Sequence, residues 1–100
     1  MKFLVIIPTY NENANISTVL NKVLNLKSKS QIDILVIDDS SPDGTSKTVK
    51  EIMSVNNNVN LLQREGKLGL SSAYCTGFIW AIDKAYDYVI QMDADLSHNP

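Results

Sequence analysis

Residues 3–12 read FLVIIPTYNE, an apolar run that passes directly into polar residues. The apolar part, Phe3–Ile7, is continuous and mostly branched, as is typical of a strand buried on both faces of a sheet. Pro8 is expected to stop this strand. Three asparagines, at positions 11, 13 and 15, are candidate N-caps for a helix. The stretch therefore predicts a buried strand that turns at once into a helix.

Strand-like and helix-like patterns alternate along the rest of the chain. The other predicted strands are residues 32–37, 59–63 and 88–92. Between strands, apolar residues recur at helical spacing, namely Ile16, Val19, Leu20, Val23 and Leu24, then Val49, Ile52 and Met53, then Leu70, Ala73, Tyr74, Gly77, Phe78, Ala81, Ile82 and Ala85. Ile79 and Trp80 fall outside the last stripe and predict apolar surface to spare. The order βαβαβαβ predicts an α/β fold, a parallel sheet with right-handed crossovers and helices on both faces.

Composition limits the classes of protein that this chain can be. One hundred residues allow one domain, and a single cysteine, Cys75, excludes an internal disulfide framework and a cysteine-rich zinc site. The lone thiol favours a reducing compartment, which predicts a cytoplasmic protein. A net charge of −2 argues against a nucleic-acid partner, since such proteins carry a basic stripe. No apolar run is long enough to span a bilayer.

Acidic residues gather where the predicted strands end. Six of the 11 acids follow apolar runs closely, and they are Glu12, Asp38, Asp39, Asp43, Asp93 and Asp95. In open parallel sheets, ligands bind beyond the carboxyl ends of the strands, where the strand order reverses. Asp43 fits a turn in SPDGT and is assigned to structure. The other acids predict a binding site along this edge.

Asp93-Ala94-Asp95 is the sharpest feature of this edge. Side chains alternate in extended chain, so Asp93 and Asp95 are expected to point the same way while Ala94 points into the packing. Two adjacent carboxylates suit Mg²⁺ or Mn²⁺. Substrate phosphates and water complete the coordination of such an ion. The structural alternative is a solvated pair of acids that ends a strand, and a DxD motif alone does not exclude it.

Three other segments each allow a functional and a structural interpretation. Tyr10 could lie along a base or ribose while Glu12 accepts a hydrogen bond from it, or the segment could only cap the first helix. Of the adjacent acids Asp38 and Asp39, only one can face a ribose hydroxyl cleanly. The basic loop 64–69 could help to neutralise a diphosphate, or it could be a flexible solvated loop.

Four segments together resemble one family. They are VIIPTYNE at 5–12, VIDDSSPDGT at 36–45, GKLGLSSAY at 66–74 and YVIQMDADLSHNP at 88–100. They are similar to the inverting, nucleotide-sugar-dependent glycosyltransferases of family 2, which have the Rossmann-like GT-A fold. Within that family the similarity is greatest to dolichol-phosphate (polyprenyl-phosphate) mannosyltransferases, and it covers essentially all 100 residues.

The resemblance implies roles for individual residues. Those implied to bind the donor are Pro8, Tyr10 and Glu12 along the nucleotide, Ile37 and Asp39 at base and ribose, and Asp93, Ala94 and Asp95 at the diphosphate. Asp93 and Asp95 are also the implied catalytic residues and the ligands of Mg²⁺ or Mn²⁺. Ser71 and Ser97 depart from the family pattern, which often has Gly and Gln there, so Ser97 is not assigned to the metal.

The implied reaction transfers mannose from GDP-mannose to a polyprenyl (dolichol) phosphate. Residues 1–100 would then be the nucleotide-sugar-binding N-terminal part of a glycosyltransferase domain, truncated after the fourth strand, with the acceptor part missing. We expect this piece alone to be inactive. The acceptor or the missing part implies association with the cytosolic face of a membrane. An exposed sheet edge predicts oligomers.

Three alternatives stay open at this stage. The first is a family 2 enzyme with another nucleotide-sugar donor or a saccharide acceptor. The second is a non-catalytic fragment that only binds nucleotide. The third is a phospho-acceptor or phosphatase domain that uses a strand-end aspartate, although such a nucleophile follows an earlier strand and needs a nearby Lys or Thr.

Overall fold

The computed structural model describes residues 2–25, 31–65 and 70–94. Strands and helices alternate along these residues as β1 (Lys2–Thr9), α1 (Ile16–Leu24), β2 (Gln31–Asp38), α2 (Thr45–Met53), β3 (Val59–Gln63), α3 (Leu70–Asp83) and β4 (Tyr88–Gln91). The predicted order βαβαβαβ is confirmed. Most predicted bounds differ from the observed ones by one or two residues.

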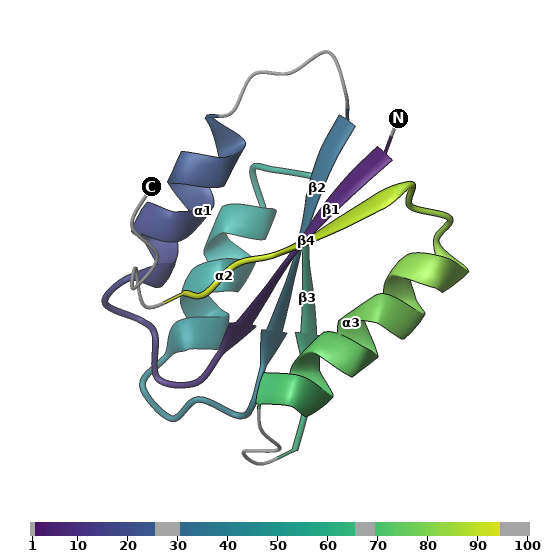
Figure 1. Cartoon of the computed structure of the whole chain (residues 1–100). Coiled ribbons are helices and arrows are strands. Elements are labelled where there is room, and N and C mark those ends of the chain that lie inside the picture. The colour runs from purple at the N-terminus through teal and green to yellow at the C-terminus, as the bar shows by residue number, and fades with distance from the viewer. Residues whose placement is uncertain (1, 26–30, 66–69, 95–100) are drawn as a thin grey trace.

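The four strands form one parallel sheet in the order β3-β2-β1-β4. The chain adds β2 and then β3 on one side of β1, and α3 then returns it to the other side, where β4 pairs with β1. Helices α1 and α2 cover one face of the sheet and α3 covers the other (Figure 1). The strand order therefore reverses between β1 and β4, which is where α/β sheets of this kind bind ligands.

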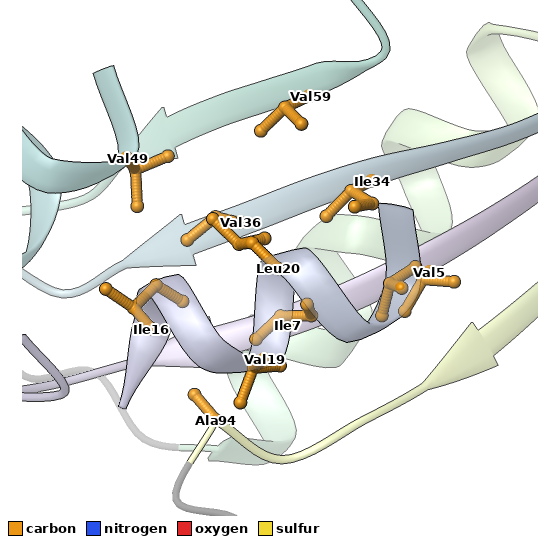
Figure 2. Packing of buried hydrophobic residues seen from close by; sticks show 11 residues of the cluster. Val5, Ile7, Ile16, Val19, Leu20, Ile34, Val36, Val49, Val59 and Ala94 are labelled. Atoms are coloured by element: carbon orange, nitrogen blue, oxygen red, sulfur yellow. The ribbon is translucent and has the colours of Figure 1, made fainter. Parts of the chain in front are cut away.

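The central strands are apolar on both faces because helices cover both. Val5 and Ile7 of β1 point towards α1, where Ile16 and Leu20 pack on them (Figure 2). Leu4 and Ile6 alternate with them and point towards α3. This arrangement explains why the first strand reads as a continuous apolar run rather than an alternating one.

The contact face of α3 differs from the predicted stripe. Phe78 and Ile82 were expected to be buried, yet they are 37% and 79% exposed. Trp80, expected off the stripe, packs instead on the α3-side core. From residue 71 to the end of this helix, the buried residues are Ala73, Gly77 and Ala81, one turn apart. Small residues at that spacing let the helix lie close to the sheet, and a close helix buries a narrower stripe than the apolar pattern suggests.

Gly77 marks the closest approach of α3 to the sheet. A Cβ atom added at this residue would lie 2.6 Å from Cδ1 of Ile6 in β1. Glycine is therefore required here by space, since no left-handed conformation is involved. Within the described ranges, no helix is both long and apolar enough to cross a membrane.

Pro8 lies inside β1, although the apolar pattern predicted that the strand would stop there. Its partner in the register is Ile37 of β2. The backbone groups of Ile6 face β4, since its carbonyl accepts a hydrogen bond from Met92 N–H (3.0 Å). Backbone groups of residues two apart in a strand point to the same side, so the nitrogen of Pro8, which carries no hydrogen, also points towards β4. It lies beyond the last residue pair of the ladder between β1 and β4. The proline therefore removes no hydrogen bond between β1 and β2.

Candidate functional site

The carboxyl ends of β1 and β4 meet at the point where the strand order reverses. Asp93 lies there, just beyond β4, and is partly exposed. Ala94 is 3% exposed and packs with the core residues under α1 (Figure 2). The prediction that Ala94 points into the packing is confirmed. Asp95 lies outside the described residues, so its predicted alignment with Asp93 stays a prediction.

Asp93 has a hydrogen-bond partner on α3. The hydroxyl of Tyr74 donates to Asp93 Oδ1 at 3.2 Å. Burial, together with the charge of Asp93 and this hydrogen bond, raises the pKa of Tyr74 to about 12. The phenol is therefore protonated at neutral pH and can donate continuously. A carboxylate held in this way at the ligand edge is a suitable donor for a hard divalent cation.

Two loops at this edge are tied together. Backbone N–H groups of the β1–α1 loop donate to side chains of the β2–α2 loop and of the first residue of α2. The bonds run from Asn11 to Ser41 Oγ (2.8 Å), from Glu12 to Thr45 Oγ1 (3.0 Å) and from Asn13 to Asp43 Oδ2 (3.0 Å). Asn11 and Ser40 both have left-handed backbone, with φ of 55° and 53°. These hydrogen bonds hold both loops in defined, partly strained shapes beside the strand ends.

Asp38 serves this structure rather than a ligand. It is 0% exposed, and Oδ1 accepts hydrogen bonds from the hydroxyls of Thr9 and Ser41, both at 2.6 Å. The backbone N–H of Ser41 donates to Oδ2 at 3.0 Å. The carboxylate therefore joins the end of β1 to the β2–α2 loop. A buried carboxylate is stable only when its oxygens are satisfied in this way.

Asp39 faces different partners. The guanidinium of Arg64 donates to both of its oxygens, at 2.6 and 2.9 Å, and both side chains are 8% exposed. Arg64 also donates to Ser72 Oγ at 2.8 Å. The bidentate ion pair joins the ends of β2 and β3, and the hydrogen bond to Ser72 links both to the start of α3. The first basic residue of loop 64–69, Arg64, is therefore held by Asp39. Residues 66–69 lie outside the described part, so the two interpretations of the loop are not decided there.

The remaining predicted site residues occupy different depths at this edge. Tyr10 is 36% exposed, and Pro8 and Glu12 are partly buried. The carbonyl of Glu12 accepts the N–H groups of Asn15 and Ile16, so the segment does help to begin α1. Asn15 is the N-cap residue, but its side chain makes no cap hydrogen bond.

Ile37 is the predicted ligand contact that lies deepest. Its side chain is 0% exposed and belongs to the core on the α3 side of the sheet. Its backbone is equally buried, inside the sheet between β1 and β3, so Ile37 presents no exposed surface to a nucleotide. Among the residues that the structure describes, no group of three or more His, Cys, Asp or Glu side chains forms a ready cation site. The predicted second carboxylate, Asp95, is not among them.

Sequence reasoning missed Tyr74 as a member of this edge, and it placed Arg64 in the basic loop there without predicting its ion pair with Asp39. The sequence pattern indicates a core role for Tyr74, and its ring does pack against the α3-side core. A tyrosine on a buried helix face needs a partner for its hydroxyl, and this requirement was the available signal. For Arg64, the signal was its place directly after β3, next to the acids that follow β2.

A separate cavity of about 740 Å³ lies at the opposite end of the sheet. Its lining includes Lys2 and Asp33 near the starts of β1 and β2, with Trp80 and Tyr86 from the end of α3 and the turn after it. Tyr86 donates its hydroxyl to Asp33 Oδ2 at 2.6 Å. None of the predicted site residues that the structure describes lines this cavity.

Residues 4–100 match the family described as Glycosyl transferase family 2. An undecaprenyl-phosphate mannosyltransferase from Micrococcus luteus is 41% identical over 100 residues, which are all of this chain and 40% of that protein. A polyprenol monophosphomannose synthase from Mycolicibacterium smegmatis is 42% identical over 98 residues, which are 97% of this chain and 36% of that protein. The chain thus spans well under half the length of these curated relatives.

Solved structures share the fold. Mannosyltransferase PcManGT from Pyrobaculum calidifontis, in complex with GDP-Man and Mn²⁺, superposes with a TM-score of 0.80 at 26% identity, covering 93% of this chain and 27% of that one. S. aureus TarS 1-349 in complex with UDP-GlcNAc superposes with a TM-score of 0.73 at 28% identity, covering 95% and 27%. The predicted GT-A architecture is therefore confirmed over the length of this chain.

Proposed function

The chain belongs to glycosyl transferase family 2, and we propose from this premise that it binds a nucleotide sugar where β1 and β4 diverge. The whole protein would transfer mannose from GDP-mannose to a polyprenyl phosphate. The observation that carries the proposal is the partly exposed Asp93 carboxylate, fixed by Tyr74 at that point of the sheet. The names of the two curated relatives and the GDP-Man complex of PcManGT support mannose as the sugar.

The donor would lie along the edge formed by the two tied loops. The residues that we propose as its contacts, following the family resemblance, are Pro8, Tyr10 and Glu12 for the nucleotide, Ile37 and Asp39 for base and ribose, and Asp93, Ala94 and Asp95 for the diphosphate. Asp39 remains in this set although Arg64 holds it, since a carboxylate oxygen can accept more than one hydrogen bond. The ion pair would then fix the direction in which Asp39 accepts a ribose hydroxyl.

Asp93 and Asp95 would hold Mg²⁺ or Mn²⁺, which when bound supplies Lewis-acid stabilisation of the departing nucleoside diphosphate. The protein's part is to present the carboxylates. Met92 N–H is bonded to Ile6 and Ala94 is anchored in the core, so the backbone on both sides of Asp93 is fixed. An acceptor phosphate is largely ionised near neutral pH. Transfer to it therefore requires no strong general base from this chain.

Partners follow from this reaction. A polyprenyl phosphate is embedded in lipid, so the protein would work at a membrane surface, and we propose the cytosolic face. Residues 1–100 would bind the donor. Contacts to the acceptor would come from a region that corresponds to the part of the relatives not aligned with this chain. β4 pairs with β1 on one side and exposes Tyr88 and Ile90 by 50% and 45%, which supports association through that edge.

A second donor class is favoured by one observation. TarS, whose structure contains UDP-GlcNAc, shares the fold at an identity similar to that of PcManGT. The same edge could therefore accept a UDP-sugar. Base selection would depend on residues near Tyr10, and Tyr10 does not by itself separate guanine from uracil.

Calorimetric titration of this chain separates the two donor classes. We expect GDP-mannose to bind more tightly than UDP-GlcNAc or UDP-glucose in the presence of Mn²⁺. For turnover, residues 1–100 of this chain would replace the matching region of the M. luteus relative, which aligns over all 100 residues. The chimera should transfer labelled mannose to polyprenyl phosphate. Preferential binding of a UDP-sugar would contradict the assigned donor, and a folded chimera without mannosyl transfer would contradict the assigned reaction.

A further inference from the structure

We propose that Tyr74 is a positioning residue for the proposed cation site, acting by orienting the Asp93 carboxylate. This inference rests on the proposed function, because it assumes that Asp93 is a cation ligand. The direct observation is the hydrogen bond from the Tyr74 hydroxyl to Asp93 Oδ1, at 3.2 Å. Tyr74 would not touch the donor or the cation itself.

The ladder between β1 and β4 ends before Asp93, so strand pairing does not orient its side chain. β4 has four residues, and its register with β1 ends at Gln91, two residues before Asp93. The backbone near Asp93 is fixed by Met92 N–H and by buried Ala94. Rotation of the carboxyl group about its own bonds is not fixed by those contacts. The Tyr74 hydroxyl limits that rotation by engaging one oxygen.

Tyr74 can do so because its own position is defined. Its ring packs against the α3-side core, and a tyrosine has only two side-chain torsions that place the ring. Ala73 and Gly77, on either side of it along α3, are buried against the sheet. Because Gly77 has no side chain, its backbone lies directly on Ile6. The helix is therefore close enough for the hydroxyl to reach the end of β4.

Outer groups that hydrogen-bond to metal ligands usually matter for affinity. Their removal typically weakens metal binding about 10- to 100-fold. Tyr74→Phe removes the hydroxyl and keeps the ring, so the packing of the α3-side core is preserved. We expect this variant to bind Mn²⁺ about tenfold more weakly in the presence of GDP, the low end of that range, because a single neutral donor is lost.

The chain offers a matched control at the other end of the sheet. Tyr86 also packs against the α3-side core and donates to a carboxylate, Asp33, at 2.6 Å. Tyr86→Phe removes the same kind of hydrogen bond at a site with no proposed ligand. Its effect on folding stability should be comparable, while its Mn²⁺ affinity should equal that of the wild-type chain.

The experiment titrates Mn²⁺ into the chain in the presence of GDP and measures free Mn²⁺ by electron paramagnetic resonance. It requires no turnover. A loss of about tenfold in Tyr74→Phe, with Tyr86→Phe unchanged, supports the inference. Equal affinities in wild type and Tyr74→Phe overturn it while leaving the proposed function intact. Equal losses in both variants overturn it as well, since they indicate general destabilisation. Absence of Mn²⁺ binding by the wild-type chain overturns the proposed function and this inference with it.

Circular dichroism establishes that each variant is folded before titration. If Tyr74→Phe does not fold, Tyr74→Met replaces it, because methionine fills irregular apolar space and also lacks a hydroxyl. The expected weakening of Mn²⁺ binding is the same for either variant.

Discussion

At the scale of single residues, Asp38 and Asp39 show how neighbouring acids come to serve different purposes. Successive side chains of an extended chain point to opposite faces. Asp38 turns towards Thr9 and Ser41 and joins the end of β1 to the β2–α2 loop, whereas Asp39 turns towards Arg64. Both carboxylates are almost fully buried, so each depends on its own partners. Removing a partner should therefore cost much more than removing an exposed charge.

Arg64→Met tests this dependence for Asp39. The substitution leaves a carboxylate buried without its ion-pair partner, and such losses cost about 3–5 kcal/mol. We expect the free energy of unfolding in urea to fall by about 3 kcal/mol, the low end of that range. Lys47→Met, at an exposed position, is the control and should change stability by less than about 0.5 kcal/mol. Similar unfolding midpoints for the two variants would show that Asp39 does not need Arg64.

Asp43 gives a prediction about pH. The hydroxyl of Thr45 donates to this carboxylate, and mainly for that reason the pKa of Asp43 lies below its ordinary value of 3.8. A lowered pKa means that the folded state favours the charged form. Its stabilising contribution is therefore present above pH 3.8 and is lost as the pH falls through the lower folded-state pKa.

Urea unfolding of wild type and Asp43→Ala across a pH series measures this effect. The stability difference between them should be constant above roughly pH 5 and should shrink at more acidic pH. A difference that grows as the pH falls would contradict the assignment of Asp43 to the loop network.

At the scale of elements, α3 is positioned by small residues rather than by large apolar ones. Ala73, Gly77 and Ala81 face the sheet, while Ile79 and Ile82 are 70% and 79% exposed. Ridges of large side chains usually separate a helix from its neighbour. Here their absence brings the backbone of α3 next to β1. The position of Tyr74 beside Asp93 depends on this short separation.

Gly77→Ala should destabilise the chain by about 1–3 kcal/mol, because the new methyl group overlaps Ile6 in a packed core. Ile6→Val removes Cδ1, the atom that would lie nearest to the added Cβ, at 2.6 Å. The double variant should therefore recover part of the loss, measured as a favourable coupling in a double-mutant cycle of unfolding free energies. Strict additivity of the two substitutions would contradict the close approach of α3.

Ala85 ends α3 in a left-handed conformation, with φ of 59°. Tyr86 N–H bonds to the Ala81 carbonyl and Ala85 N–H to that of Ile82, both at 3.1 Å, which is the Schellman pattern. Glycine adopts this conformation without the penalty of a Cβ atom. Ala85→Gly should therefore stabilise the chain by up to about 1 kcal/mol, seen as a higher melting temperature. A lower melting temperature would indicate that Ala85 does not hold this conformation.

At the scale of the whole molecule, the sequence was sufficient to predict the order of strands and helices and the edge of the sheet at which the acidic residues lie. Continuous apolar runs identified the strands, and the resemblance supplied the family. The strand order was not available, because pairing between β1 and β4 depends on contacts 85 residues apart, such as Lys2 N–H to Asp87. The narrow buried face of α3 was also missed, because apolar periodicity weights large side chains and ignores close packing by Gly77.

The candidate site was predictable in part for a similar reason. Asp93 was proposed from its place after a strand, while the choice of Asp39 over Asp38 and the role of Ala94 came from the family resemblance. The pairing of these acids with Arg64 and Tyr74 was not predicted, because those pairs form only when β3 and α3 are placed against the sheet. Ile37 shows the opposite difficulty. Its place in the motif predicted a contact with the nucleotide, yet the residue is fully buried. Position in sequence indicates the edge, and packing decides which atoms reach it.

The most direct test of the proposed cation site is calorimetric titration of GDP-mannose into the chain, with and without Mn²⁺, for wild type, Asp93→Asn and the control Asp87→Asn. Asp87 is an exposed acid at the opposite end of β4. We predict Mn²⁺-dependent binding to wild type and to Asp87→Asn, and binding weakened about tenfold or more in Asp93→Asn. Binding that is indifferent both to Mn²⁺ and to Asp93→Asn would contradict the claim that this carboxylate holds a cation against the diphosphate of the donor.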